Sequence, residues 1–250
     1  MSHAGPPAGP LDFDGLDLIV FDKDGTLIDF DAMWGGWAED LADRLEATLG
    51  RPIRTELHRE IGYDTLARRT NPGSALAATP MARLRVMTTD LIARSTGRSQ
   101  AAAAAVVDEA WGAPDPVGLA RPLTDLVELF SGLRGARRQV AVVTSDDRRP
   151  TEATLAFLGI ASLVDALVCA DDGLPSKPAP DTLLHACRIL GVDPIRTAMI
   201  GDSIADMRMA KAAGVGRRIA VLSGIGREAE LEPVSDIVID SIAVLMPLRA

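Results

Sequence analysis

Six short apolar runs recur along the chain, and they constrain its fold more than any other feature. Each run is four to six residues long and mostly aliphatic, which is typical of strands buried on both faces of a sheet. The runs are Leu18–Phe21, Gln139–Thr144, Ala166–Ala170, Thr197–Gly201, Arg218–Leu222 and Asp236–Asp240.

Helical segments separate the later runs. Thr151–Leu158 follows Pro150 and stops at Gly159, and this order of proline and glycine is typical of a helix start and end. Asp181–Leu190 and Asp206–Ala213 are also followed by a glycine. Strands that alternate with helices predict an α/β fold with a doubly wound parallel sheet.

The stretch between the first two runs differs, because it contains no convincing buried strand. Asp31 could cap a first helix, and Met81–Arg94 and Ser99–Trp111 also look helical. The apolar positions of the first helix recur at helical spacing, and they are Trp34, Ala38, Leu41, Leu45 and Leu49. We expect a helical cap domain at residues 31–118, inserted into a core of residues 15–30 and 119–250. The preceding residues 1–14 are rich in Pro and Gly and are expected to be a flexible N-terminus.

Composition narrows the class of protein. The 250-residue chain has a formal net charge of -9, which argues against a nucleic-acid surface. It has no apolar run long enough to span a membrane, and its two cysteines are too few for a disulfide framework. The expectation is a cytoplasmic monomer or homodimer without nucleic-acid or membrane partners.

The first chemical motif is Asp22-Lys23-Asp24-Gly25-Thr26, at the exit of the first run. Ligands of open α/β sheets bind at the carboxyl ends of strands, and two carboxylates there can divide the roles of nucleophile and general acid–base. Taken alone, the same residues could be a polar surface turn.

Three further motifs follow later runs or the loops between them. Thr144-Ser145 offers hydroxyls for phosphoryl oxygens, Lys177 offers a positive charge, and Asp202 to Asp206 offers hard oxygen ligands of the kind that magnesium prefers. Each has a plain structural alternative, which is a strand-end threonine, an exposed loop lysine or a helix cap.

In this order, the four motifs resemble those of the haloacid dehalogenase superfamily, in particular phosphatases of the helical cap subgroup such as phosphoglycolate phosphatases. The resemblance implies a Rossmann-like core, Asp22 as nucleophile, Asp24 as general acid–base and Lys177 as the charge-stabilising lysine. It also implies substrate binding by Thr144 and Ser145. Mg²⁺ would be bound by the Asp22 carboxylate, the Asp24 backbone carbonyl and Asp202. Asp206 would not bind the metal directly but would orient water or Lys177.

Two residues depart from the family pattern. Ser145 stands where many relatives have Asn, which puts one phosphate contact in doubt. Lys23 stands where relatives usually have an apolar residue, and we expect it to form a structural salt bridge.

The resemblance also ranks the alternatives. Asp24 favours phosphoryl transfer over dehalogenation, and the absence of lysine between Leu27 and Gln139 disfavours phosphonate cleavage through a cap lysine. Trp34 stands where mutase relatives have a hinge histidine, so a phosphomutase is the weaker alternative. A catalytically silent binding module on the same fold also stays open.

The substrate expected from these motifs is a small phosphorylated metabolite, selected by the cap. Between Arg51 and Arg98 the sequence has nine arginines and four acids, which suggests recognition of an anionic phosphate monoester. His58 could reach substrate, but an exposed position on a helix is the expectation for it.

Overall fold

The computed structural model describes residues 13–246, which form two compact units. We call the described residues up to Phe30 together with those from Ala120 onward the core unit, and Asp31–Leu119 the helical unit. Apart from Phe13 and Asp14, the expected flexible segment 1–14 lies outside the described residues. Phe13 is buried, with the Arg138 guanidinium 5.8 Å from the centre of its ring.

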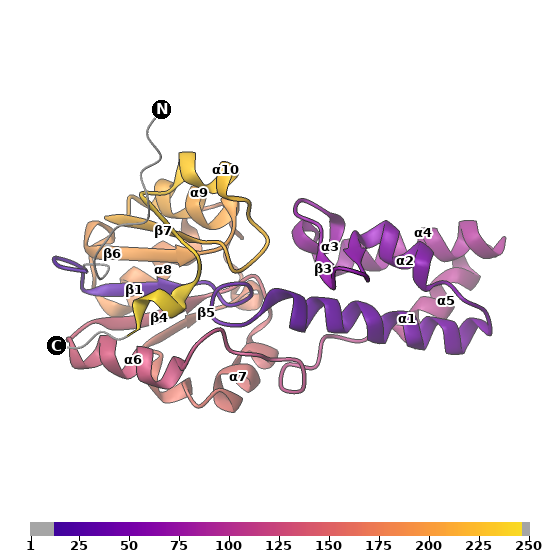
Figure 1. The fold of residues 1–250 in the computed structure, drawn as a ribbon, viewed down its shortest axis with the longest axis horizontal. Coiled ribbons are helices and arrows are strands. Elements are labelled where there is room, and N and C mark those ends of the chain that lie inside the picture. Colours follow the sequence, from indigo (N-terminus) through magenta and orange to yellow (C-terminus); the bar gives the residue numbers. More distant parts are fainter. Residues whose placement is uncertain (1–12, 247–250) are drawn as a thin grey trace. The chain divides into compact units, whose positions relative to one another are not determined.

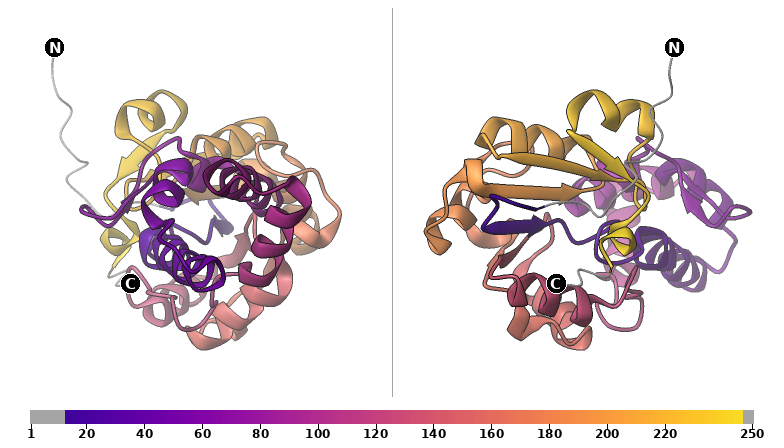
Figure 2. Two further views of the ribbon diagram at one scale, coloured as in Figure 1. Left: turned by 90° about the vertical axis from the view of Figure 1, so that its right-hand side faces the viewer. Right: turned by 60° about the vertical axis from the view of Figure 1, so that its left-hand side comes forward.

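The core unit contains one six-stranded sheet, in which every neighbouring pair is parallel (Figures 1 and 2). All six predicted runs form strands, which confirms the predicted fold class. The strand order is β5-β4-β1-β6-β7-β8. The strands are β1 (Leu18–Phe21), β4 (Gln139–Val143), β5 (Ala166–Val168), β6 (Thr197–Gly201), β7 (Arg217–Val221) and β8 (Ile237–Ile239).

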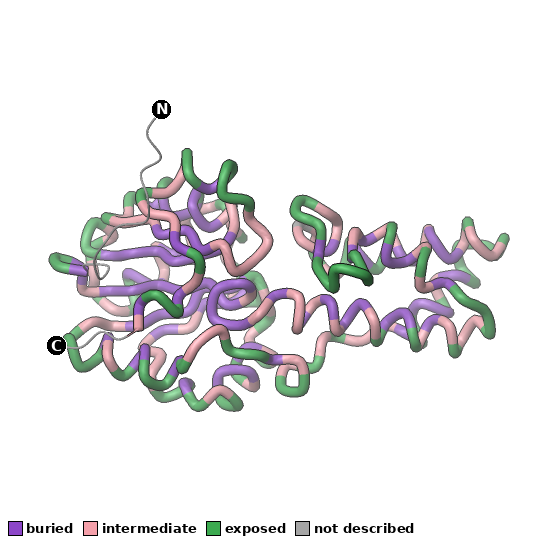
Figure 3. The backbone as a smooth tube through the Cα atoms, viewed as in Figure 1, coloured by how far each residue is buried: buried purple, intermediate pink, exposed green. Residues whose placement is uncertain are grey.

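Helices cover both faces of this sheet. The helices of the core unit are α6 (Leu126–Gly135), α7 (Arg148–Phe157), α8 (Asp181–Leu190), α9 (Ile204–Ala213) and α10 (Glu228–Leu231), with short 3-10 turns at Ala161–Leu163, Ala170–Asp172, Pro194–Arg196, Glu232–Val234 and Ile242–Leu245. α8 and α9 pack on the face that carries Leu18 and Val20. α6 packs on the other face, where Phe130 stacks on Phe21 with ring centres 5.1 Å apart. The central strands are therefore buried on both sides, as Figure 3 shows for β1 and β6.

Two helices begin earlier than predicted. α7 starts at Arg148 rather than Thr151, so Pro150 lies in its first turn, where a missing N–H costs no helical hydrogen bond. α9 starts at Ile204 rather than Asp206, because Ser203 is its N-cap residue.

The helical unit contains the three predicted helices and several elements that the sequence analysis missed. Its elements are a π-helical turn η1 (Asp31–Gly35), α1 (Gly36–Leu49), α2 (Arg54–Ile61), β2 (Tyr63–Asp64), β3 (Arg69–Thr70), α3 (Ala75–Ala78), α4 (Met81–Thr96) and α5 (Gln100–Ala110). Asp31 is the first residue of η1, and its carboxylate accepts a hydrogen bond from the Thr70 backbone N–H at 2.7 Å.

The core of the helical unit is built around Trp37. Its ring packs edge-on against Trp111 at 5.3 Å, and its indole N–H donates to the Gly112 carbonyl at 2.7 Å. Ala38, Leu41 and Leu45 of α1 are also fully buried, at the positions that their helical spacing predicts. No helix within residues 13–246 is long and apolar enough to cross a membrane.

Candidate active site

The candidate site lies at the carboxyl ends of three neighbouring strands. Asp22 follows β1, Thr144 follows β4 and Asp202 follows β6, and these strands are adjacent and parallel in the sheet. The Asp22 N–H donates to the carbonyl of Ile200 on β6 at 2.9 Å, which continues the ladder to the edge of the site. The topology therefore brings together residues more than a hundred positions apart in the sequence.

Lys177 joins this edge from the loop before α8. Its ammonium lies 2.6 Å from Asp22 Oδ1 and 2.7 Å from Asp206 Oδ1, and all three side chains are buried. Burial alone would lower the pKa of Lys177, but the charges of Asp206 and Asp22 outweigh it and raise the pKa above its usual value. Lys177 is therefore a fixed positive charge beside the Asp22 carboxylate.

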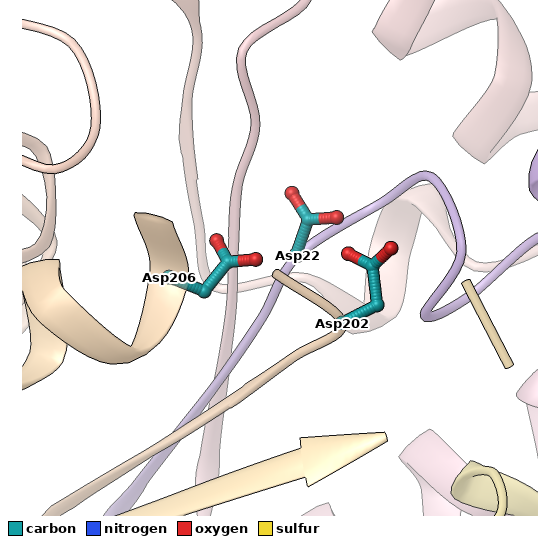
Figure 4. A group of neighbouring side chains, drawn as sticks. All are labelled: Asp22, Asp202 and Asp206. Carbon is teal, nitrogen blue, oxygen red and sulfur yellow. The ribbon is translucent and has the colours of Figure 1, made fainter. Parts of the chain in front are cut away.

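Asp22, Asp202 and Asp206 form a buried carboxylate cluster (Figure 4). One oxygen from each side chain lies within 4.8 Å of the others. Burial raises the pKa of Asp22 to about 7 against the opposing effect of Lys177, while Asp206 and Asp24 add to the rise. Burial and the neighbouring Asp22 and Asp206 also raise the pKa of Asp202 well above its usual value.

The cluster is chemically suited to a divalent cation. When all three carboxylates are ionised, they and the Lys177 ammonium carry a net charge of about −2, which one divalent cation cancels. All the donors are hard carboxylate oxygens, the class of ligand that Mg²⁺ prefers. The residues present therefore fit the metal that the family resemblance implies.

Two glycines and a backbone N–H fix the position of Asp202. A Cβ atom on Gly25 would lie 2.4 Å from Asp202 Oδ2, and one on Gly224 would lie 1.9 Å from the same atom. Gly25 also has a φ of 78°, a conformation that L side chains rarely adopt. The Ile225 N–H donates to Asp202 Oδ2 at 2.8 Å. A side chain at either glycine would therefore displace this carboxylate.

The two carboxylate oxygens of Asp206 have different partners, Ser203 and Lys177. Its second oxygen accepts a hydrogen bond from the Ser203 hydroxyl at 2.5 Å, and the Asp206 N–H donates back to that hydroxyl at 3.2 Å. This is a capping box at the start of α9, and it leaves the other oxygen of Asp206 to bind Lys177. Ser203 was not among the predicted site residues, although its Ser-x-x-Asp spacing with Asp206 is typical of a capping box.

Thr144 and Ser145 differ in exposure. Thr144 is buried and its hydroxyl accepts a hydrogen bond from the Asp146 N–H at 3.2 Å, whereas Ser145 is exposed. Both directly follow β4, next to the β1 end that carries Asp22.

Lys23 forms the expected salt bridge. Its ammonium lies 2.9 Å from Asp24 Oδ1 and 2.9 Å from Asp146 Oδ2. Asp146 was not predicted as its partner, because nothing in the local sequence links Asp146 to a lysine more than a hundred residues earlier.

The helical unit differs from the sequence-based expectations for His58 and for its arginines. His58 is buried rather than exposed, since its ring packs edge-on against Tyr63 at 5.2 Å. Over Asp31–Leu119 the unit has ten arginines and twelve acids, so the local arginine excess does not make the whole unit positive. Several arginines also contact partners within the unit: Arg51 contacts the Ser95 carbonyl, Arg54 contacts Glu39, Asp43 and Glu46, Arg85 contacts Asp108, and Arg94 contacts Glu60.

Two phosphatases are similar to this chain in sequence over most of its length. Fructose-1-phosphate phosphatase YqaB of Escherichia coli (strain K12) is 29% identical over 198 residues, which cover 79% of this chain and 92% of that protein. A phosphoglycolate phosphatase of Thiobacillus denitrificans is 31% identical over 204 residues, which cover 80% of each chain. These relatives are phosphatases by name, which is consistent with a phosphoric monoester hydrolase.

Solved structures with the same fold cover nearly the whole chain. A HAD-superfamily hydrolase, subfamily IA, variant 1, of Geobacter sulfurreducens PCA has a TM-score of 0.61 at 17% identity and covers 98% of this chain and 99% of its own. CbbY of Rhodobacter sphaeroides in complex with phosphate has a TM-score of 0.56 at 25% identity and covers 92% of this chain and 96% of its own. The sequence model of the haloacid dehalogenase-like hydrolase family matches residues 16–214, which is more than half of the chain. The chain therefore belongs to that family.

Proposed function

We propose that the chain is a Mg²⁺-dependent phosphatase that hydrolyses a small phosphate monoester through an aspartyl-phosphate on Asp22. The observation that carries the proposal is the Asp22 carboxylate itself. It is buried, contacts Lys177 at 2.6 Å and belongs to a cluster of three carboxylates suited to a divalent cation.

In the first half-reaction, a carboxylate oxygen of Asp22 attacks the substrate phosphorus, and the bond to the leaving oxygen breaks. Asp24 donates a proton to that oxygen, so the alcohol leaves as a neutral molecule. Lys177 neutralises charge on the nucleophile and on the transferred phosphoryl group.

In the second half-reaction, Asp24 is ionised and accepts a proton from water as that water attacks the phosphorus. The bond between phosphorus and the Asp22 oxygen breaks, which releases inorganic phosphate and restores both carboxyl groups. The hydroxyls of Thr144 and Ser145 are proposed to donate hydrogen bonds to phosphoryl oxygens in both steps.

The Asp22 carboxylate, the Asp24 backbone carbonyl and Asp202 would hold the metal, with Asp206 orienting Lys177. When bound, Mg²⁺ would screen the repulsion between the anionic nucleophile and the phosphoryl oxygens. The net negative charge of the carboxylate cluster supports this assignment.

The substrate proposed is a phosphorylated metabolite of the size that phosphoglycolate phosphatases take. The names of two relatives, which act on phosphoglycolate and fructose 1-phosphate, support a small monoester and leave its alcohol part open. Among the exposed arginines of the helical unit, Arg59, Arg83 and Arg98 are proposed as candidates for recognising an anionic substrate.

A panel of phosphorylated metabolites incubated with Mg²⁺ tests the proposal. We expect one or a few monoesters to release phosphate much faster than the rest. Transfer of phosphate between positions of one sugar, without release, would favour the phosphomutase alternative. Binding without release or transfer would favour a silent binding module.

A further inference from the structure

Lys23 is a buried cation placed between the two aspartates of the first motif. Its side chain is 2% exposed, whereas the Asp24 and Asp146 side chains that it contacts are 13% and 25% exposed. The ammonium therefore contacts one residue of the proposed catalytic pair that follows β1 and one residue that follows β4.

Both side-chain contacts of the Lys23 ammonium given above are ion pairs, with the carboxylates of Asp24 and Asp146. A buried ion pair of this kind is weak evidence for a role in stability, since apolar side chains of similar volume often stabilise a protein equally well. The location of this ion pair beside Asp24 therefore says more about its role than its contribution to stability does.

The contact with Lys23 restricts the Asp24 side chain. One carboxylate oxygen of Asp24 lies 2.9 Å from the ammonium, and Asp146 Oδ2 also lies 2.9 Å from it. Three backbone N–H groups, those of Thr26, Leu27 and Ile28, donate to the Lys23 carbonyl and close the turn on which Asp24 lies. Backbone and side chain of Lys23 therefore both limit the orientations of the Asp24 carboxylate.

We propose that Lys23, anchored by Asp146, is a positioning residue that orients the Asp24 carboxylate for proton transfer. The inference rests on the proposed function, in which Asp24 exchanges protons with the leaving oxygen and with water. Misplacing an acid–base group by about 1 Å costs on the order of 100-fold in rate, so the orientation of Asp24 is worth fixing.

The test is Lys23→Met, with Lys211→Met as its control because Lys211 is exposed on α9. For an alkyl phosphate, whose leaving oxygen needs a proton, we expect kcat to fall about 10- to 100-fold with KM changed less than about threefold. For p-nitrophenyl phosphate, whose leaving group needs no proton, we expect a burst of nitrophenol at the wild-type rate. A slow steady state should follow, since water attack still needs Asp24.

A double-variant cycle separates positioning from a general structural effect. If Lys23 acts through Asp24, Lys23→Met combined with Asp24→Asn should be no slower than Asp24→Asn alone. Additive losses, or an equal loss in the burst and the steady state, would overturn the inference.

Asp146→Asn is the second variant, in case Lys23→Met does not fold. It removes the charge that anchors Lys23 and should give the same pattern with a loss of about 3- to 10-fold. Unchanged kinetics in Asp146→Asn would overturn the anchoring role. A wild-type protein that releases phosphate from no monoester of the metabolite panel would instead refute the proposed function, and the inference with it.

Discussion

Ser203 and Asp206 cap each other across the first turn of α9, with the serine hydroxyl 2.5 Å from the carboxylate oxygen that faces it. The other oxygen of Asp206 binds Lys177, which in turn binds Asp22. A helix cap is therefore connected to the proposed nucleophile through Asp206 and Lys177.

Ser203→Ala should reduce both stability and activity. Loss of the cap is expected to cost about 1 kcal/mol of unfolding free energy, and the loosened Asp206 should lower kcat severalfold. Ser99→Ala is the matched control, because Ser99 caps α5 in the helical unit by the same kind of hydrogen bond. Denaturant unfolding and phosphate release should show similar stability losses for the two variants, with an activity loss for Ser203→Ala alone.

Asp22→Asn should abolish turnover without unfolding the protein. An amide is a poor nucleophile, and removal of a nucleophile costs roughly 10⁴-fold or more in other hydrolases. The metal-free variant should be at least as stable as the wild type, because it removes one charge from a buried cluster of like charges. Glu230→Gln, an exposed acid changed to its amide, is the control. Near wild-type phosphate release by Asp22→Asn would exclude the covalent mechanism.

Asp24→Asn should slow both half-reactions by about 100-fold or more, since the amide can neither donate a proton nor accept one. With an aryl phosphate the first step should be least affected, so phosphorylated protein should accumulate. Mass spectrometry of acid-quenched samples would detect an added phosphoryl group on Asp22. Unaltered rates in rapid-quench and steady-state assays would remove Asp24 from the acid–base role.

Metal binding should strengthen as pH rises. The pKa of Asp22 is raised from 3.8 to about 7. Between these pH values, Asp22 therefore binds more protons in the folded metal-free protein than in the unfolded chain. Its contribution to the free energy of unfolding accordingly falls as pH rises through that interval. Because Mg²⁺ competes with the proton, its Kd should be roughly 30-fold weaker at pH 5.5 than at pH 8.

Thermal unfolding with and without Mg²⁺ measures this effect. At pH 8 and a metal concentration 100 times Kd, the shift in Tm should be about 5–10 °C and should shrink towards pH 5.5. Comparing samples with and without metal at each pH cancels the titration of acids elsewhere in the protein. A shift independent of pH would show that Asp22 is not a ligand.

Removal of metal should stop turnover reversibly. Excess chelator is expected to abolish phosphate release, and added Mg²⁺ should restore it. Ca²⁺ accepts more ligands in a looser geometry, so it should raise Tm but support little turnover. Full activity in excess chelator would contradict the metal dependence.

Much of the core could be predicted from sequence because its strands are buried on both faces. β1 and β6 have the predicted bounds, since their unbroken apolar runs end at the chemical motifs. The meeting of Asp22, Asp202 and Lys177 at one edge follows from the shared carboxyl ends of parallel strands.

Other features depend on contacts that no local pattern encodes. α2 has only two aliphatic residues, Leu57 and Ile61, and β2 and β3 are two residues each. These elements have too few apolar positions to be predicted from a periodic pattern. The burial of His58 depends on Tyr63, and the partner of Lys23 depends on which strand lies beside β1.

The segments that leave and re-enter the core unit are hydrogen-bonded to each other. The Asp29 N–H donates to the Arg121 carbonyl at 2.8 Å, and the Leu123 N–H donates to the Leu27 carbonyl at 3.0 Å. With its ends joined in this way, the insertion between them acts on the core as a closed loop. Loop-closure entropy grows only with the logarithm of length, so replacing residues 31–119 by about four glycines would change it by only about 3 kcal/mol. The core is thus tolerant of what is inserted at this point, and the same scaffold could accept insertions of very different length and sequence.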